Sequence, residues 1–210
     1  MPEDRAQPFA PERVRTNMGG VAASLDLDAE LMLRVRDGDG VSFAALLNKH
    51  RSPVVHFLCR MVGNQAIAEE LAQDVFLRVY RSRGSYAPTA KFTTWLFRIA
   101  THTALNALRD GKHERAEESL DSVSADLPVR QIPDGRPSME QSLVNQVKLE
   151  EVRRAVAALP AKQRAAVLMH KYEEMDYSQI ASSLGCSESA VKSLLFRAYE
   201  TLRASLAKMA

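Results

Sequence analysis

The end of the sequence carries a short helix, a turn and a longer helix in the order that DNA-binding proteins use. Asp176 and Gln179 resemble a capping box and predict a helix over 177–184; Gly185 predicts the turn, and Ser187 can cap the next helix. The first turns of such a second helix face base edges in the major groove. An ordinary helical hairpin is the alternative. The outward side chains that we expect to contact DNA are Ser187, Glu188, Ser189, Lys192, Ser193 and Arg197.

A second group of side chains combines an aromatic ring with cations and an amide along 92–110. Helical spacing places Phe92, Leu96 and Ile99 on one face and Trp95 and Arg98 on the other. Bases stack on aromatic rings and phosphates bind cations, so the second face suits single-stranded nucleic acid. A half-buried structural role for Trp95 is the alternative. With the preceding loop, this group contains Arg83, Tyr86, Lys91, Thr94, Trp95, Arg98, His102, Asn106 and Arg109.

A third group lies on the helix expected over 64–84, where Asn64 is the predicted cap and Ile67, Leu71, Val75 and Val79 form the inward stripe. Its other face mixes acidic and large apolar side chains, which is typical of a protein-docking surface with an apolar centre and a charged rim. A helix packed on two sides is the alternative. The docking residues are Glu69, Glu70, Leu71, Gln73, Asp74, Phe76, Leu77, Arg78 and Tyr80.

The sequence gives little support for catalysis, a metal or a cofactor. His50 and His56 do not share a helical face well and have no acid or cysteine at metal-ligand spacing. A glycine-rich phosphate loop is absent from the sequence. Cys59 and Cys186 lie far apart, and we expect two small buried side chains in a reducing cytoplasm rather than a disulfide. No apolar run approaches the length that spans a bilayer.

Composition and charge divide the chain into four segments. Residues 1–25 are rich in Pro, Arg and Gly without periodicity and predict a flexible arm, whereas 26–112 predict a four-helix domain. Residues 113–139 predict a flexible linker, and 140–210 predict a second helical domain that ends in the helix-turn-helix. The net charges of 29–113 and 114–139 are +5 and −3. This alternation points weakly to nucleic acid, and scattered solvated charge is the alternative.

The expected fold is therefore all-α, with two small helical domains. In the first domain, Asp28 can cap a helix that Gly38 and Gly40 end. The next helix should break near Pro53 and stop at Gly63. In the second domain, helical pattern stops before Pro160 and resumes over 161–175. No alternation long enough to predict a strand occurs.

The three groups, in this order, resemble RNA polymerase sigma factors of the extracytoplasmic-function (ECF) type. The resemblance lies in "AEELAQDVFLRVYR", "FTTWLFRIATHTALNALR", "LPAKQRAAVLMHKYEEMDYSQIASSLGCSESAVKS" and "RAYETL", and covers about 29–112 and 140–206. The sequence departs from the usual family pattern at four positions, namely His102, Ala190, Leu194 and Tyr199. These departures affect the expected −35 sequence and binding strength rather than the architecture.

The resemblance implies a non-catalytic cytoplasmic subunit of RNA polymerase that needs no cofactor and does not enter the membrane. Residues 69–81 would dock on the coiled coil of the largest polymerase subunit, and 82–109 would open the −10 element. Residues 140–206 would read the −35 element and pack on the flap of the second-largest subunit, and the linker would thread near the polymerase channels. The resemblance also implies an anti-sigma partner.

Two further hypotheses stand beside this one. A stand-alone helix-turn-helix transcriptional regulator would bind duplex DNA tightly without polymerase. A helical adaptor that does not bind DNA would tolerate the loss of Lys192 and Arg197.

Overall fold

The computed structural model describes residues 26–114 and 139–207, and side chains within 26–111 and 148–207. All regular structure in these ranges is helical. The predicted arm 1–25 and nearly all of the predicted linker lie outside the described residues. The helix before the linker extends to Glu114, and the helix after it begins at Met139.

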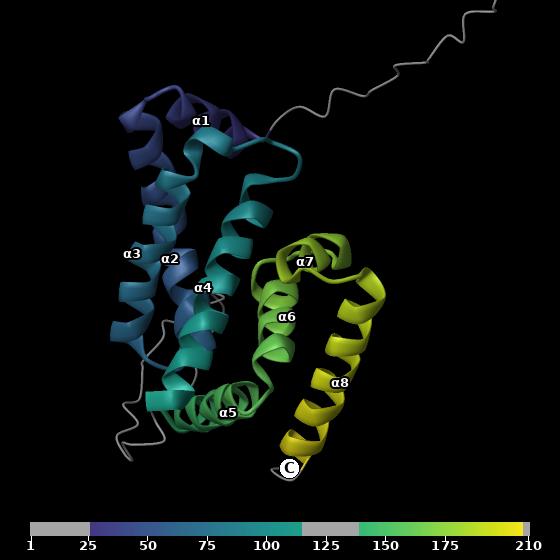
Figure 1. The fold of residues 1–210 in the computed structure, drawn as a ribbon. Coiled ribbons are helices and arrows are strands. Elements are labelled where there is room, and N and C mark those ends of the chain that lie inside the picture. The colour runs from purple at the N-terminus through teal and green to yellow at the C-terminus, as the bar shows by residue number, and fades with distance from the viewer. Residues whose placement is uncertain (1–25, 115–138, 208–210) are drawn as a thin grey trace, which may run out of the picture.

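The N-terminal half contains four α-helices and one 3-10 turn. Three long helices, α2 (Gly40–Val62), α3 (Gln65–Arg81) and α4 (Phe92–Glu114), stand side by side, and α1 (Leu27–Arg36) crosses one end (Figure 1). The turn η1 (Arg83–Ser85) follows α3. Asn64 caps α3 as predicted, and Gly63 ends α2 with a left-handed φ of 77°.

Two predictions about the first helices are wrong. Asp26, not Asp28, caps α1, because Asp28 lies inside the helix and is buried. Helix α2 continues through Pro53 without a break. A proline removes one hydrogen bond, here to the carbonyl of Lys49. Neighbouring side chains such as Val54 and Phe57 are buried in the core, and this packing keeps the chain helical.

The buried stripe of α3 also differs from the predicted one. Val75 and Val79 are buried as expected, but Leu71 is only half-buried and Ile67 is exposed. Ala68 and Ala72 are buried instead. Their small side chains allow the backbones of α2 and α3 to approach closely, so the packing selects alanine over the more apolar isoleucine.

The C-terminal half contains α5 (Met139–Ala157), α6 (Ala161–Tyr172), α7 (Tyr177–Leu184) and α8 (Glu188–Leu206) (Figure 1). The helix-turn-helix forms as its local signals predict. Asp176 and Gln179 make a complete capping box, Gly185 turns the chain at a φ of 63°, and Ser187 caps α8.

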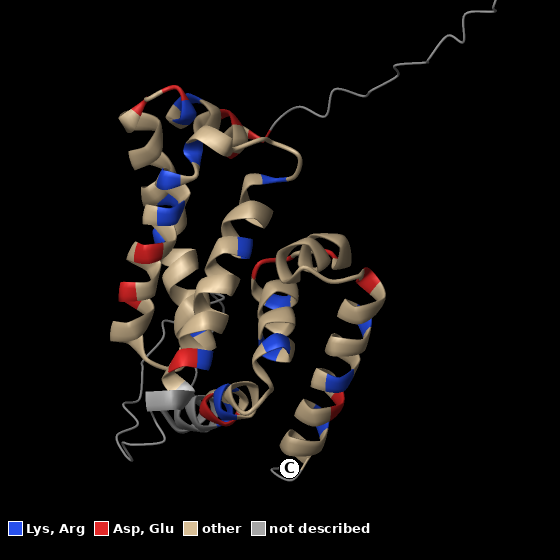
Figure 2. Ribbon diagram, viewed as in Figure 1, with Lys and Arg blue, Asp and Glu red and all other residues tan. Residues whose placement is uncertain are grey.

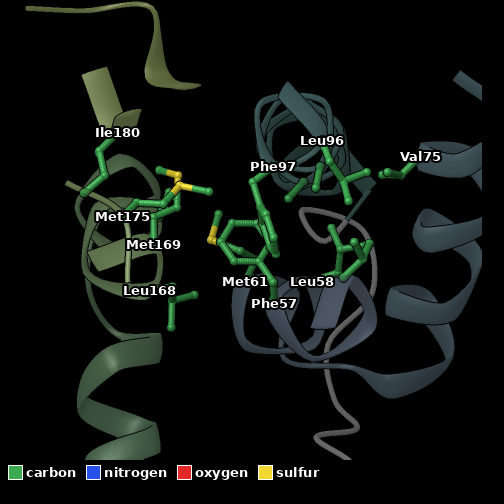
Figure 3. Packing of buried hydrophobic residues seen from close by; sticks show 14 of the residues in the cluster. Phe57, Leu58, Met61, Val75, Leu96, Phe97, Leu168, Met169, Met175 and Ile180 are labelled. Carbon is green, nitrogen blue, oxygen red and sulfur yellow. The ribbon is translucent and has the colours of Figure 1, made fainter. Parts of the chain in front are cut away.

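The two halves share one hydrophobic core rather than standing apart. We call the contact between the two halves the seam. Phe57 and Met61 of α2 and Phe97 of α4 face a second set of side chains across it (Figure 3). That second set consists of Leu168 and Met169 of α6, with Met175 and Ile180. We call this arrangement, in which α6 and α7 pack on α2 and α4, the closed form.

Candidate nucleic-acid interface

Helix α8 presents its outward face freely. All six side chains predicted to contact DNA are exposed, whereas Val191, Leu195 and Ala198 are buried beneath them. The Ser187 hydroxyl accepts from the Ala190 N–H at 3.2 Å, which fixes the start of the helix. A preformed helix N-terminus with exposed hydroxyls and cations is suited to phosphate and base edges.

An aromatic side chain that the predicted DNA-contact set omits lies on the same face. Phe196 is 68% exposed and lies on one open surface of α8 with Lys192, Ser193 and Arg197. The Lys192 ammonium lies 5.8 Å from the centre of the Tyr177 ring. Phe196 follows Lys192 by four residues, and this helical spacing places both side chains on one face of α8. An exposed ring can contact a thymine methyl group in the major groove.

Helix α4 is less accessible than α8. Lys91, Arg98, His102, Asn106 and Arg109 are exposed, as a DNA-binding face requires. Thr94 is buried and Trp95 is half-buried. The cations of this helix therefore face solvent, while its first turn is enclosed by protein.

An aromatic cluster forms around the start of α4. The Tyr86 ring lies 4.9 Å from Trp95 and 6.3 Å from Phe92, and Phe92 lies 5.9 Å from Trp95. Tyr86 is only 4% exposed, and burial, reinforced by the charges of Asp26 and Asp28, raises its pKa to about 12. The cluster places the predicted stacking residue Trp95 on a rigid apolar support.

Helix α7 covers part of α4. The Ser183 side chain is fully buried, and its hydroxyl donates to the Thr94 carbonyl at 3.3 Å. The hydroxyls of Thr94 and Tyr86 are both buried without a hydrogen-bond partner among the described residues. The first helix of the DNA-reading motif thus packs directly on the helix predicted to open DNA.

Two cationic side chains connect the halves at the other end of the seam. The Arg164 guanidinium of α6 donates to the Met61 carbonyl at the end of α2, to the carbonyl of Ala157, the last residue of α5, and to the Leu159 carbonyl. The Arg60 guanidinium lies 4.1 Å from the centre of the Tyr172 ring. The sequence singled out neither residue, because each acts through a partner in another helix.

The outer face of α3 forms a mixed acidic and apolar surface, which we call the α3 surface. Figure 2 shows the positions of its acidic and basic residues along the helix. Leu77 and Tyr80 are exposed together with acidic and polar side chains. The expected exposure of Phe76 is wrong, because its side chain is buried, and Leu71 is half-buried. The exposed members of the predicted docking group are Glu69, Glu70, Gln73, Asp74, Leu77, Arg78 and Tyr80.

Arg83 belongs to the end of this surface rather than to the face of α4. Its guanidinium lies 4.1 Å from the Tyr80 ring centre and donates to the Tyr80 carbonyl at 2.9 Å. Tyr80 in turn contacts Phe43 at 5.0 Å. The two predicted groups therefore meet at this point.

The described histidine, cysteine and acidic side chains do not assemble into a metal site or a disulfide. Among the described residues, no group of three His, Cys, Asp or Glu side chains could hold a metal ion. Cys59 and Cys186 are both free thiols; Cys59 is buried as expected, but Cys186 is exposed at the turn before α8, so its expected burial is wrong. None of the helices in the described ranges is long and apolar enough to cross a bilayer.

Comparison with known families gives two matches that coincide with these surfaces. The model for sigma-70 region 2 matches residues 46–114, and the model for sigma-70, region 4 matches residues 149–202. The chain is 36% identical over 179 residues to the RNA polymerase sigma factor CarQ of Myxococcus xanthus, covering 85% of this chain and 97% of CarQ. It is 28% identical to the RNA polymerase sigma-H factor of Pseudomonas aeruginosa, covering 85% of this chain and 93% of that factor.

Solved structures agree with the fold. CnrH, solved in complex with the cytosolic domain of CnrY, is similar with a TM-score of 0.63 at 19% identity, over 87% of this chain and 99% of that one. The sigma factor RpoE of Bartonella quintana, solved with the anti-sigma factor NepR, gives 0.62 at 21% identity, over 78% and 96%. The chain belongs to the RNA polymerase sigma factors of the ECF type.

Proposed function

We propose that this chain directs core RNA polymerase to specific promoters and helps to open the −10 region. The observation that carries the proposal is that one chain has two helices whose exposed faces suit DNA in different ways. Helix α8 presents an exposed major-groove face, and α4 presents cations beside a supported Trp95. A stand-alone duplex-binding regulator has no need of the second helix.

The α3 surface supplies the polymerase contact in this proposal. The exposed acids Glu69, Glu70 and Asp74 of α3 would repel DNA, and with the exposed Leu77 they suit a protein partner that has basic groups at its rim. We assign the coiled coil of the largest subunit to this surface and the flap of the second-largest subunit to the C-terminal half. Reversing charge at Glu70 or Asp74 should weaken polymerase association first, and reversal at Glu30, which is exposed on α1, is the control.

The closed form must open for both helices to bind one promoter. Elements centred near −10 and −35 are about 25 base pairs apart, or roughly 85 Å of B-form DNA. Helices α4 and α8 both contact α7, so the parts of these helices that contact it lie about two helix-packing distances apart, roughly 20 Å. The halves must therefore separate, and polymerase binding to each half is the source of free energy that we assign to this step.

Features of the seam are consistent with a contact that is made and broken. The Thr94 hydroxyl, in the turn of α4 that α7 covers, is buried without a hydrogen-bond partner among the described residues, and an unpaired buried polar group costs about 1–3 kcal/mol. This cost weakens the closed form. In this proposal the closed form is the state of the chain that is not bound to polymerase. An anti-sigma protein of the kind solved with the sigma factor RpoE would act by stabilising the closed form.

We assign no catalytic residue to the chain, and its site of action would be the cytoplasm, with RNA polymerase. The test is run-off transcription by core polymerase with and without this chain, on promoters enriched from genomic DNA. Promoter-dependent transcripts only in its presence are expected. The absence of such transcripts would contradict the proposal, and tight duplex binding without polymerase, measured by gel shift at stated salt, would favour the stand-alone regulator.

A further inference from the structure

We propose that Asp26 is a positioning residue for promoter opening, because its one carboxylate caps two helices and thereby fixes the start of α4. The inference rests on the proposed function, since it concerns how α4 is held while it opens DNA. Asp26 lies outside the residues matched by the sigma-70 region 2 model, which begin at residue 46.

The two oxygens of the carboxylate serve different helices. Oδ1 accepts from the Ala29 N–H of α1 at 2.6 Å, and Oδ2 accepts from the Phe92 N–H of α4 at 3.0 Å. The first N–H groups of a helix have no partner within it. Lys91, which precedes α4, has no acceptor atom in its side chain, so it cannot cap the helix itself. Helix α4 therefore takes its acceptor from a residue 66 positions away.

Helix α1 is held firmly enough to make this contact a fixed one. The buried Asp28 carboxylate lies 2.7 Å from the Lys49 ammonium through both oxygens and 2.9 Å from His50 Nε2. The His50 ring in turn packs 5.4 Å from Phe92. Burial lowers the pKa of His50, and the hydrogen bond to Asp28 opposes this shift. The Asp28 contacts thus anchor α1 to α2 beside the first residue of α4.

The position of Phe92 controls the side chains that would hold a base. Phe92 contacts both Tyr86 and Trp95, and Tyr86 lies in the loop before α4. Functional side chains must be held within about 0.5 Å of their productive positions. By holding the Phe92 N–H, Asp26 therefore fixes the positions of the Trp95 ring and the end of the loop. Asp26 thus acts on promoter opening through these residues and not by contacting DNA itself.

The test uses holoenzyme assembled from core polymerase and the full chain. Asp26→Ala removes both caps, and Asp26→Asn keeps one carbonyl oxygen but places an N–H₂ donor at the other site. Asp39→Ala is the matched control, because Asp39 caps only α2, through the Val41 and Ser42 N–H groups. Permanganate reactivity of unpaired thymines in the −10 element reports opening, and polymerase binding is measured separately.

We expect Asp26→Ala to lower the open-complex equilibrium about fivefold, the effect of a typical lost cap, with Asp26→Asn between it and wild type. Polymerase binding by Asp26→Ala should persist, and Asp39→Ala should open promoters like wild type. On a template premelted at −10, the open complex formed by Asp26→Ala should return to the wild-type level. Equal defects in Asp26→Ala and Asp39→Ala, parallel loss of polymerase binding, or unchanged opening would each overturn the inference. Failure of wild-type holoenzyme to open any promoter would instead reject the proposed function.

Discussion

Helices α8 and α4 both face DNA in the proposed function, but they differ in how exposed they are in the closed form. The outward side chains of α8 are all exposed, whereas the first turn of α4 lies beneath α7 and has a buried side chain at Thr94, and Tyr86 is buried in the loop before this helix. A helix that reads intact duplex can be preformed and free. A helix that holds an unpaired base needs an apolar support, and an apolar surface of that kind also attracts another part of the same chain.

The largest effect should come from breaking the cover on α4. Ser183→Glu places a carboxylate at a fully buried position against Thr94, at a cost of several kcal/mol to the closed form. We expect a larger radius of gyration in small-angle scattering with unchanged helical content by circular dichroism.

The matched control for that variant is Ser182→Glu, because Ser182 is the exposed neighbour on α7. It should leave the radius of gyration at the wild-type value. An unchanged radius in Ser183→Glu would show that the contact between α7 and α4 does not hold the halves together.

Replacing an aromatic ring on each helix should separate their roles. Trp95→Ala removes a stacking platform worth about 1–3 kcal/mol per base, so opening should fall roughly 5- to 150-fold while polymerase binding persists. Phe196→Ala should leave opening of a premelted template unchanged and reduce discrimination at the −35 element. Equal loss of opening and polymerase binding in Trp95→Ala would make Trp95 a purely structural residue.

The seam should also respond to pH through Glu173, which follows the Tyr172 ring that Arg60 contacts. Burial raises the pKa of Glu173 from 4.5 to about 7, although the charge of Arg60 opposes the shift. Between pH 4.5 and about 7 the Glu173 carboxyl is ionised in the unfolded chain but protonated in the folded chain. The free energy of unfolding should therefore fall as pH rises from about 4.5 to about 7 and then stay constant. Thermal unfolding across this range measures the effect.

Glu173→Gln should flatten this part of the pH dependence. Glu174→Gln provides the control, because Glu174 is the exposed neighbour and should keep the wild-type profile. A profile that remains steep in Glu173→Gln would assign the titration to another group.

The smallest effect should come from single cations on α8. Lys192→Ala removes one exposed charge that faces the DNA backbone in the proposed function. Binding of holoenzyme to promoter DNA should then show a salt dependence whose slope is smaller by about one, with little change in sequence preference. An unchanged slope would mean that Lys192 does not contact phosphate.

Local signals predicted α7 and α8 better than any other part of the fold. Asp176, Gln179, Gly185 and Ser187 act on residues within one turn of themselves, so their roles can be read from spacing alone. The family resemblance was confirmed by matches to both regions.

Contacts between distant helices could not be read in this way. Nothing in the sequence near Phe92 indicates that Asp26 caps it, and Ser183 looks like any polar residue of a short helix. The same limit explains α3, where apolarity favoured Ile67 but the close approach of α2 selected Ala68. The cover on α4 is a property of tertiary packing, and local spacing assigned neither Thr94 nor Ser183 to it.

The shared core gives the separation of the halves a temperature dependence. Parting α6 and α7 from α2 and α4 exposes Phe57, Phe97, Met169 and their neighbours to water, which raises the heat capacity of the separated form. Because the hydrophobic attraction weakens on cooling, the balance should shift toward separation as temperature falls. The same apolar contacts that stabilise the closed form would thus make promoter binding easier at low temperature.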